Sequence, residues 1–306
     1  MKIGVILVTY NSQKDITRIL ESILIQKNEN LVVYIVDNNS NDDTLKLIET
    51  YKSKISFCII SSKINNGFAK GNNIGIQKAI DDGCDLVFIL NPDMQLDENC
   101  IDILTKKIMS DEKIGAIGPI VLLGNHQDNI IQSYGVSADF KTQRKIVLLT
   151  GQSLTSELPS ENYVDYLIGG AMMFKSSVLK ITGLFEEDYF MYNDELDIAY
   201  RIKTAGFRTV CIRDARVSHF HDFSAKNRRG NNLMYYYIMR NRYLYFKKFN
   251  LYKNLFLSLI GEFIIIPSKV MWSIRRMKNL KILKFYYSGI FDGLLGKRGF
   301  ANKSFD

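Results

Sequence analysis

The stretch LVFILNPD, residues 86–93, joins a short apolar run to a polar turn. Earlier apolar runs at 3–8, 31–36 and 55–60 share its length and its richness in Ile and Val. Such runs are typical of strands that are buried on both faces of a parallel sheet. Amphipathic helical patterns at 15–25, 42–51 and 69–80 lie between them. This alternation predicts an α/β fold of βαβ units with right-handed crossovers.

The rest of the chain extends the alternation and then changes character. Residues 98–110 and 193–205 are predicted as helices, and 114–121 and 209–219 as strands. Residues 124–159 predict hairpins and loops. After Ser224 the sequence becomes aromatic, apolar and basic. We therefore expect a first domain over residues 1–225, with halves of about 1–120 and 121–225, and a helical region over residues 226–306.

The composition bounds the class of protein. The 306 residues, 46% of them apolar, suffice for one large domain with an appendage, or for two domains. The four cysteines show no paired spacing, which favours a reduced, cytosolic compartment over a disulfide framework or zinc site. The apolar N-terminus is short and lacks a cleavage-like end, so it predicts a first buried strand rather than a secretory signal.

The net charge of +8 is divided unevenly. Residues 226–306 hold 17 Lys and Arg against three acids, a net charge of +14, whereas residues 1–225 carry a net charge of −6. The apolar run at 255–266 is too short for a transmembrane span of about 20 residues. Basic residues follow it at 275, 276, 278, 281 and 284. This pattern predicts helices that lie on an anionic membrane surface, and the interleaved apolar residues disfavour a nucleic-acid partner.

Polar residues follow each of the first four predicted strands. In open α/β sheets, ligands bind beyond the carboxyl ends of the strands. Asp93 can therefore ligate Mg²⁺ or Mn²⁺ through oxygen, and the cation can stabilise a departing diphosphate. The alternative is that Asn91-Pro92-Asp93 forms only a turn.

The segment 65–75 is rich in glycine and asparagine, which lets backbone approach a ligand before a helix N-terminus. Its glycines are four residues apart, so it does not match the dinucleotide-binding fingerprint. Helix packing by small residues is the alternative interpretation.

Seven segments, in order, resemble family 2 glycosyltransferases, and within them the rhamnosyltransferase-like bacterial members. The segments are VTYN (8–11), VDNNS (36–40), NNGFAKGNNIG (65–75), NPD (91–93), GGA (169–171), FMYNDELD (190–197) and VSH (217–219). The resemblance implies a GT-A fold, with a Rossmann-like, mainly parallel central sheet flanked by helices and a C-terminal helical appendage. Residues 1–225 would then be the catalytic domain, with a nucleotide-sugar half and an acceptor half.

The resemblance also implies roles for individual residues. Those expected to bind the nucleotide-sugar are Thr9, Asn11, Asp37, Asn39, Asn66, Gly67, Gly71, Asn72, Asn91 and Asp93. Asp37 would accept a hydrogen bond from the ring N–H of uracil or thymine, or else cap the next helix. Gly169, Gly170 and Asp197 would bind the acceptor. Asp93 and His219 would hold the metal, although packing is the alternative for His219, and His221 is a weaker candidate.

The catalytic base is expected in the acidic segment 193–197. The family has Glu-Asp here, with the second residue as base, whereas this chain has Asp194-Glu195. Position favours Glu195, and residue type favours Asp194. Alternatively, these acids only stabilise a helix N-terminus that Asn193 caps.

The function implied is an inverting transfer of a sugar to a hydroxyl group of a lipid-linked or cell-surface polysaccharide. The donor favoured is dTDP-rhamnose, with a UDP-sugar as the alternative. The enzyme would be cytoplasmic and peripheral on the inner face of the membrane. Arg228, Arg229 and Arg240 would meet a diphosphate or form a solvated basic face. The alternative function is a catalytically silent nucleotide-sugar-binding scaffold in a membrane glycan-assembly complex.

Overall fold

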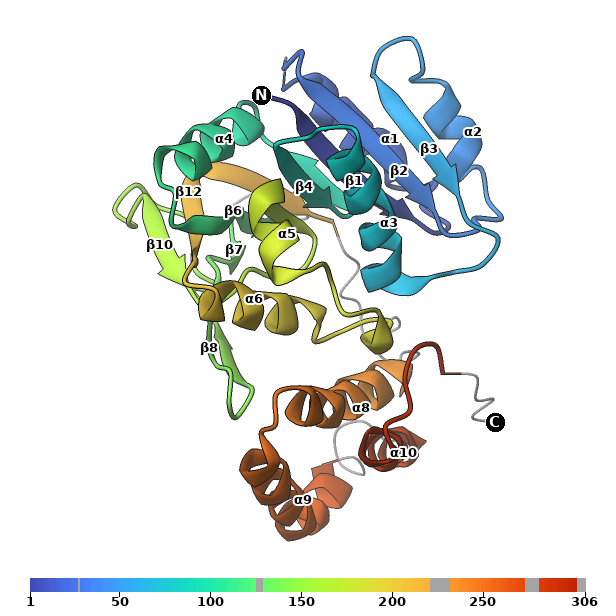
Figure 1. Ribbon diagram of the computed structural model, residues 1–306, viewed down its shortest axis with the longest axis vertical. Coiled ribbons are helices and arrows are strands. Elements are labelled where there is room, and N and C mark those ends of the chain that lie inside the picture. Colours follow the sequence, from blue (N-terminus) through green and yellow to red (C-terminus); the bar gives the residue numbers. More distant parts are fainter. Residues whose placement is uncertain (27, 125–128, 221–231, 273–280, 302–306) are drawn as a thin grey trace. The chain divides into compact units, whose positions relative to one another are not determined.

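The computed structural model describes residues 1–26, 28–124, 129–220, 232–272 and 281–301 (Figure 1). The backbone divides into two compact units. Unit 1 comprises residues 1–138, 145–185 and 198–221, and unit 2 comprises residues 139–144, 186–197 and 222–306. The predicted domain boundary, between residues 225 and 226, lies outside the described residues.

Unit 1 is built on a sheet with the strand order β10-β12-β6-β11-β4-β1-β2-β3. The bounds are β1 (Ile3–Thr9), β2 (Leu31–Asp37), β3 (Phe57–Ser61), β4 (Leu86–Leu90), β6 (Ile114–Leu123), β10 (Glu161–Val164), β11 (Ala171–Lys175) and β12 (Arg208–His219). Strands β4, β1, β2 and β3 are parallel, as predicted. Strand β11 lies antiparallel between β4 and β6. Two short strands extend this sheet and two more form a hairpin: β5 (Met94–Leu96) pairs with β12, β7 (Ile131–Ser133) pairs with β6, and β8 (Val136–Asp139) pairs with β9 (Arg144–Val147).

Helices cover both faces of the sheet. One buried cluster takes side chains from α1 (Ile16–Leu24), α2 (Thr44–Glu49) and α4 (Cys100–Ser110). The other takes them from α3 (Gly67–Asp81), α5 (Ser176–Thr182) and α6 (Asp194–Thr204). On β1, Val5 and Leu7 join the first cluster and Ile6 joins the second. This alternation is the reason why the strand is apolar without a break from Val5 to Val8.

Unit 2 contains the helices of the C-terminal region, which are α8 (Asn232–Lys248), α9 (Tyr252–Trp272) and α10 (Lys281–Leu295). Glycines on α10 let it approach α8 closely, because a Cβ at Gly289 or Gly293 would meet the carbonyl of Tyr236 or Arg240. The Phe190 ring stacks on Tyr237 of α8 with centroids 5.4 Å apart. Among the described residues, none of the helices combines the length and the apolar character that crossing a membrane requires.

Candidate functional site

The loops after β1 and β2 are joined by a buried carboxylate. Asp37 is 2% exposed. Its Oδ1 accepts hydrogen bonds from Thr9 Oγ1 (2.9 Å) and Ser40 Oγ (2.6 Å), and its Oδ2 accepts one from Ser40 N (3.0 Å). A carboxylate oxygen can accept two bonds, so Oδ2 retains capacity for one more. Asn11 and Asn39 have left-handed φ values of 51° and 67°, which asparagine tolerates better than most residues.

The residues after β3 that were predicted to bind the nucleotide-sugar lie in two different environments, the start of α3 and its buried face. Asn66 Nδ2 donates to Ser62 Oγ (2.9 Å), and Gly67 begins α3 with a φ of 74°. In contrast, Gly71 and Asn72 are buried in α3, and a Cβ at Gly71 would lie 2.7 Å from Val8 Cγ1. Gly71 therefore allows α3 to pack closely on β1, and the contact of both residues with the nucleotide-sugar stays a prediction.

The turn after β4 lies beside the predicted acceptor glycines. Asn91 N donates to Gly170 O at 2.8 Å. Gly170 has a φ of 119°, and a Cβ there would lie 2.9 Å from Asn91 Nδ2. Only glycine allows this approach. The residues Gly169 and Gly170 immediately precede β11, so the antiparallel pairing of β11 with β4 brings them to the end of β4.

The structure brings together the two residues that were predicted to hold the metal. Strand β5, directly after Asp93, pairs with the end of β12 so that Met94 lies opposite His219. His219 Nε2 lies 3.1 Å from Asp93 Oδ2, and Nδ1 lies 2.8 Å from Gln132 Oε1. The two side chains are 12% and 24% exposed. Gln132, on β7, was not predicted, because nothing in its local sequence marks it.

The acidic segment at the start of α6 belongs to unit 2. Asp194 is 1% exposed, Asp197 has no exposed surface and Glu195 is half-buried. Burial raises the pKa of Asp194 well above its usual range, and the Glu195 and Asp197 carboxylates raise it further, while Arg240 acts in the opposite direction. Of the two candidate bases, Glu195 is the more accessible.

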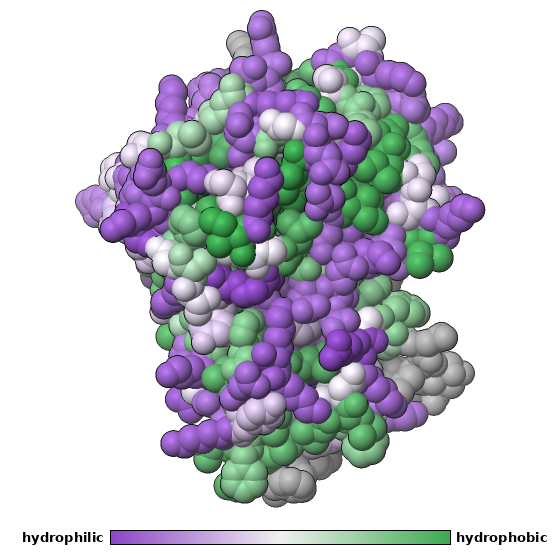
Figure 2. Space-filling model, viewed as in Figure 1, coloured by the Kyte–Doolittle hydropathy of each residue, from purple (hydrophilic) through white to green (hydrophobic). Residues whose placement is uncertain are grey.

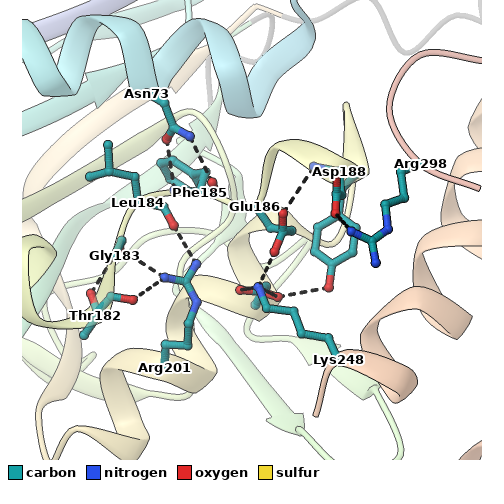
Figure 3. Close-up of polar contacts among 12 residues, drawn as sticks. Asn73, Thr182, Gly183, Leu184, Phe185, Glu186, Asp188, Arg201, Lys248 and Arg298 are labelled. Atoms are coloured by element: carbon teal, nitrogen blue, oxygen red, sulfur yellow. Dashed lines mark hydrogen bonds and ion pairs between the residues drawn. The ribbon is translucent and has the colours of Figure 1, made fainter. Parts of the chain in front are cut away.

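Asp197 is the buried member of an ion network that also contains Lys248 and Glu186, which Figure 3 labels. Its Oδ2 accepts from Tyr189 Oη (2.9 Å) and lies 2.8 Å from Lys248 Nζ. Lys248 Nζ also lies 2.6 Å from Glu186 Oε2. The Asp197 carboxylate is enclosed, whereas the Lys248 side chain is 30% exposed. The predicted contact of Asp197 with the acceptor remains a prediction.

The C-terminal turns of α6 hold the segment that follows α5 (Figure 3). The Arg201 guanidinium donates to the carbonyls of Thr182 (2.5 Å), Gly183 (3.1 Å) and Leu184 (2.7 Å). The Asn73 side chain both donates to and accepts from the Phe185 backbone, at 2.9 Å each. The backbone of residues 182–185 is therefore fixed by side chains of α6 and α3.

Neither expectation for Arg240, a diphosphate contact or a solvated basic face, fits the structure. Arg240 is 1% exposed, and its guanidinium donates to backbone carbonyls. The prediction was wrong because a basic sequence does not show which cations point inward. His221, Arg228 and Arg229 lie outside the described residues.

Comparison with known proteins assigns the chain to a family. The model of glycosyl transferase family 2 matches residues 4–181. The chain belongs to glycosyl transferase family 2. The match covers Asp37, Asp93 and both predicted acceptor glycines, and it ends before the acidic segment of α6.

Curated relatives of this glycosyltransferase include enzymes of glycan synthesis. It is 26% identical over 206 residues to the low-salt glycan biosynthesis hexosyltransferase Agl10 of Haloferax volcanii, covering 66% of this chain but only 61% of the relative's length. It is 25% identical to the N-acetylglucosaminyl-diphospho-decaprenol L-rhamnosyltransferase of Mycobacterium tuberculosis, over 70% of this chain and 75% of the relative. It is 24% identical to rhamnosyltransferase WbbL of Escherichia coli, over 82% of this chain and 98% of the relative.

Solved structures share the fold at low identity. TarS 1–349 of S. aureus, in complex with UDP-GlcNAc, has a TM-score of 0.61 and 17% identity, covering 97% of this chain and 82% of that one. The mannosyltransferase PcManGT of Pyrobaculum calidifontis, in complex with GDP-Man and Mn²⁺, has a TM-score of 0.57 and 13% identity, covering 97% and 86%. These likenesses confirm the predicted GT-A fold.

Proposed function

We propose that this glycosyltransferase moves a sugar from a nucleotide-sugar to a hydroxyl group of a lipid-linked or cell-surface polysaccharide, with inversion. The observation that carries the proposal is the pairing of Asp93 with His219 at the end of β4 and β12. Among donors we favour dTDP-rhamnose over UDP-sugars, because two relatives are named as rhamnosyltransferases. The name of the mycobacterial relative, which includes a diphospho-decaprenol, supports the lipid-linked acceptor.

The geometry of Asp93 and His219 fits a divalent cation, Mg²⁺ or Mn²⁺. Gln132 Oε1 lies within hydrogen-bond distance of His219 Nδ1, and His219 Nε2 faces the Asp93 carboxylate. The Asp93 carboxylate and the His219 imidazole would hold the cation. When bound, the cation would stabilise the departing nucleoside diphosphate.

The loops after β1 and β2 would hold the nucleotide. Thr9 and Ser40 fix the Asp37 carboxylate and leave Oδ2 able to accept one bond from a pyrimidine N–H. Asn11, Asn39, Asn66 and Gly67 would line this pocket. Gly71 and Asn72 would act there through the packing of α3.

Glu195 would be the base that deprotonates the acceptor hydroxyl. Asp194 is almost fully buried, so Glu195 is the carboxylate that an acceptor hydroxyl can more readily reach. Gly169 and Gly170 would contact the acceptor. Asp197 would act indirectly, because its ion pair with Lys248 fixes the start of α6.

The C-terminal region would place the enzyme on the inner face of the membrane. Five apolar side chains of α9 are exposed: Tyr252, Phe256, Leu257, Ile260 and Ile264. Apolar residues gather over α9 at the bottom of Figure 2. The acids Glu262 and Asp292 are buried, so the described surface of residues 232–301 exposes basic but no acidic side chains. An apolar helix face within a basic surface suits an anionic bilayer.

Turnover of dTDP-rhamnose and UDP-sugars with Mn²⁺, together with thermal shift, tests the proposal. We expect one donor class to raise the Tm, because a ligand stabilises the state that it binds, and the same donor to be cleaved. A donor that binds but is not cleaved, either by water or in the presence of an acceptor, would instead indicate the catalytically silent scaffold.

A further inference from the structure

The loop that leads into α6 has an unusual backbone. Phe190, Tyr192 and Asn193 have left-handed φ values of 63°, 65° and 69°. Non-glycine residues rarely adopt this region, and they persist there only where surrounding structure holds them. This loop immediately precedes Asp194 and Glu195, so its conformation sets the place of both carboxylates.

Two adjacent residues of α8 hold this loop. Asn241 Nδ2 lies within hydrogen-bond distance of the carbonyls of Tyr189 (3.1 Å), Met191 (2.7 Å) and Tyr192 (2.9 Å). Arg240 Nη2 donates to the carbonyls of Asp188 (3.3 Å) and Tyr189 (2.9 Å). The donors of α8 thus reach four carbonyls of one short loop.

The side chains of Arg240 and Asn241 are themselves held in place by hydrogen bonds. Arg240 Nε donates to Asn241 Oδ1 (3.0 Å), and Arg240 Nη1 donates to Gly299 O (2.6 Å). Arg240 and Asn241 are 1% and 0% exposed. Burying a guanidinium and an amide is costly unless their hydrogen bonds are made. Apolar side chains would pack α8 at a lower cost, so packing alone does not account for these two residues.

We propose that Arg240 and Asn241 are positioning residues, which hold the catalytic carboxylates at the start of α6. The proposal rests on the proposed role of Glu195 or Asp194 as the base. It assigns a part in positioning the catalytic carboxylates to the C-terminal region, which the sequence pattern predicted as a membrane-surface appendage. The residues lie beyond the part of the chain that the family model matches.

The test is donor cleavage by Asn241→Ala and Arg240→Met, with dTDP-rhamnose or the UDP-sugar that the wild type cleaves. A displacement of about 1 Å at a reacting group can lower the rate about 100-fold. We expect a loss of that order in kcat, with the affinity for UDP or dTDP unchanged, since the proposed nucleotide pocket lies in unit 1. Arg240→Lys, which keeps the charge, should retain more activity than Arg240→Met and covers the case in which the latter does not fold.

Arg213→Met is the matched control. Arg213 also donates to backbone carbonyls, those of Ser156 and Leu158, but in a loop of unit 1. Its loss should lower stability without lowering kcat of the folded enzyme. If Arg213→Met and Asn241→Ala lose kcat equally, a general structural effect explains both and the proposal is overturned.

Rescue of donor cleavage by azide distinguishes a displaced catalytic base from a general structural defect. It attacks the anomeric carbon without needing a base, while the nucleoside diphosphate departs with the bonding electrons. We expect azide to restore donor cleavage in Asn241→Ala and in Glu195→Ala alike. The positioning role is overturned if Asn241→Ala keeps the wild-type kcat. It is also overturned if azide restores donor cleavage in Glu195→Ala but not in Asn241→Ala. If Glu195→Gln and Asp194→Asn both keep full turnover, the proposed base is wrong and this inference fails with it.

Discussion

His219 Nε2 lies 3.1 Å from Asp93 Oδ2, although 126 residues separate them in the chain. The contact arises because β5 leaves the Asp93 turn and pairs with the last residues of β12. Phe220 N then donates to Asp93 O at 2.8 Å, which closes the same turn from the other side. The backbone therefore fixes both side chains before any ligand is bound.

Removing either residue should weaken the response to Mn²⁺. We expect Asp93→Asn and His219→Ala to lower donor turnover at least 100-fold at limiting Mn²⁺, because a metal supplies several kcal/mol of charge stabilisation. Gln132→Leu, which removes the acceptor for Nδ1, should weaken Mn²⁺ affinity about 10–100-fold. Titration of turnover with Mn²⁺ measures both effects. Asp97→Asn, just after β5, is the control, and an Asp93→Asn enzyme with the same Mn²⁺ curve would refute the metal site.

The two acids at the start of α6 should differ in their effect on catalysis. Glu195→Gln should lower turnover about 10²–10⁴-fold, the usual contribution of a general base. Asp194→Asn should cost less, because Asp194 is buried and we propose that Glu195 meets the acceptor. Steady-state rates with the best donor decide between them. A Glu195→Gln enzyme with full turnover, beside an inactive Asp194→Asn enzyme, would transfer the role to Asp194.

The parallel half of the sheet was predictable because its strands carry a local signal. Buried strands such as β1 are apolar over most of their length, and polar residues mark their carboxyl ends. The insertion of β11 between β4 and β6 was not predictable, since it depends on contacts between residues about 80 positions apart in the chain. No local pattern distinguishes that pairing from others.

The candidate site, like the sheet, was predictable from the sequence only in part. Thr9, Asp37 and Asp93 stand directly after predicted strands, so their position alone pointed to a ligand. Arg240 and Lys248 stand in a basic, aromatic helix, and the sequence predicted for Arg240 a diphosphate contact or a solvated basic face. They point inward because buried carbonyls and carboxylates of residues 186–197 provide their partners, and those partners become visible only in the folded chain.

Asp194→Asn should stabilise the protein as the pH rises. The pKa of Asp194 is raised in the folded state, so ionising it there opposes folding. Below about pH 4 the carboxyl is protonated in both folded and unfolded states and the cost is absent. Above that, the cost grows until the pH passes the folded pKa, and asparagine avoids it. Each kcal/mol gained raises the Tm by about 2–4 °C for chains of roughly this size.

The measurement is the Tm of both proteins from pH 4 to pH 9. The difference should be near zero at pH 4 and should favour Asp194→Asn at neutral pH. Asp81→Asn, at an exposed position in α3, serves as the control and should show no such divergence. A variant that is less stable than the wild type at every pH would mean that the carboxylate makes net favourable contacts.

The apolar face of α9 should determine binding to anionic membranes. Phe256 and Ile260 are 62% and 40% exposed, and burying one such side chain in the interface contributes about 1.5–3 kcal/mol. Phe256→Glu or Ile260→Glu should therefore weaken binding about 10–100-fold in co-sedimentation with phosphatidylglycerol–phosphatidylcholine vesicles. Ile181→Glu, on α5 of unit 1 and 65% exposed in the wild type, adds the same charge elsewhere and should leave binding nearly unchanged. Because the basic surface also contributes, binding of the wild type should fall with added salt. Equal losses in all three variants would show that net charge, rather than the α9 face, governs the interaction.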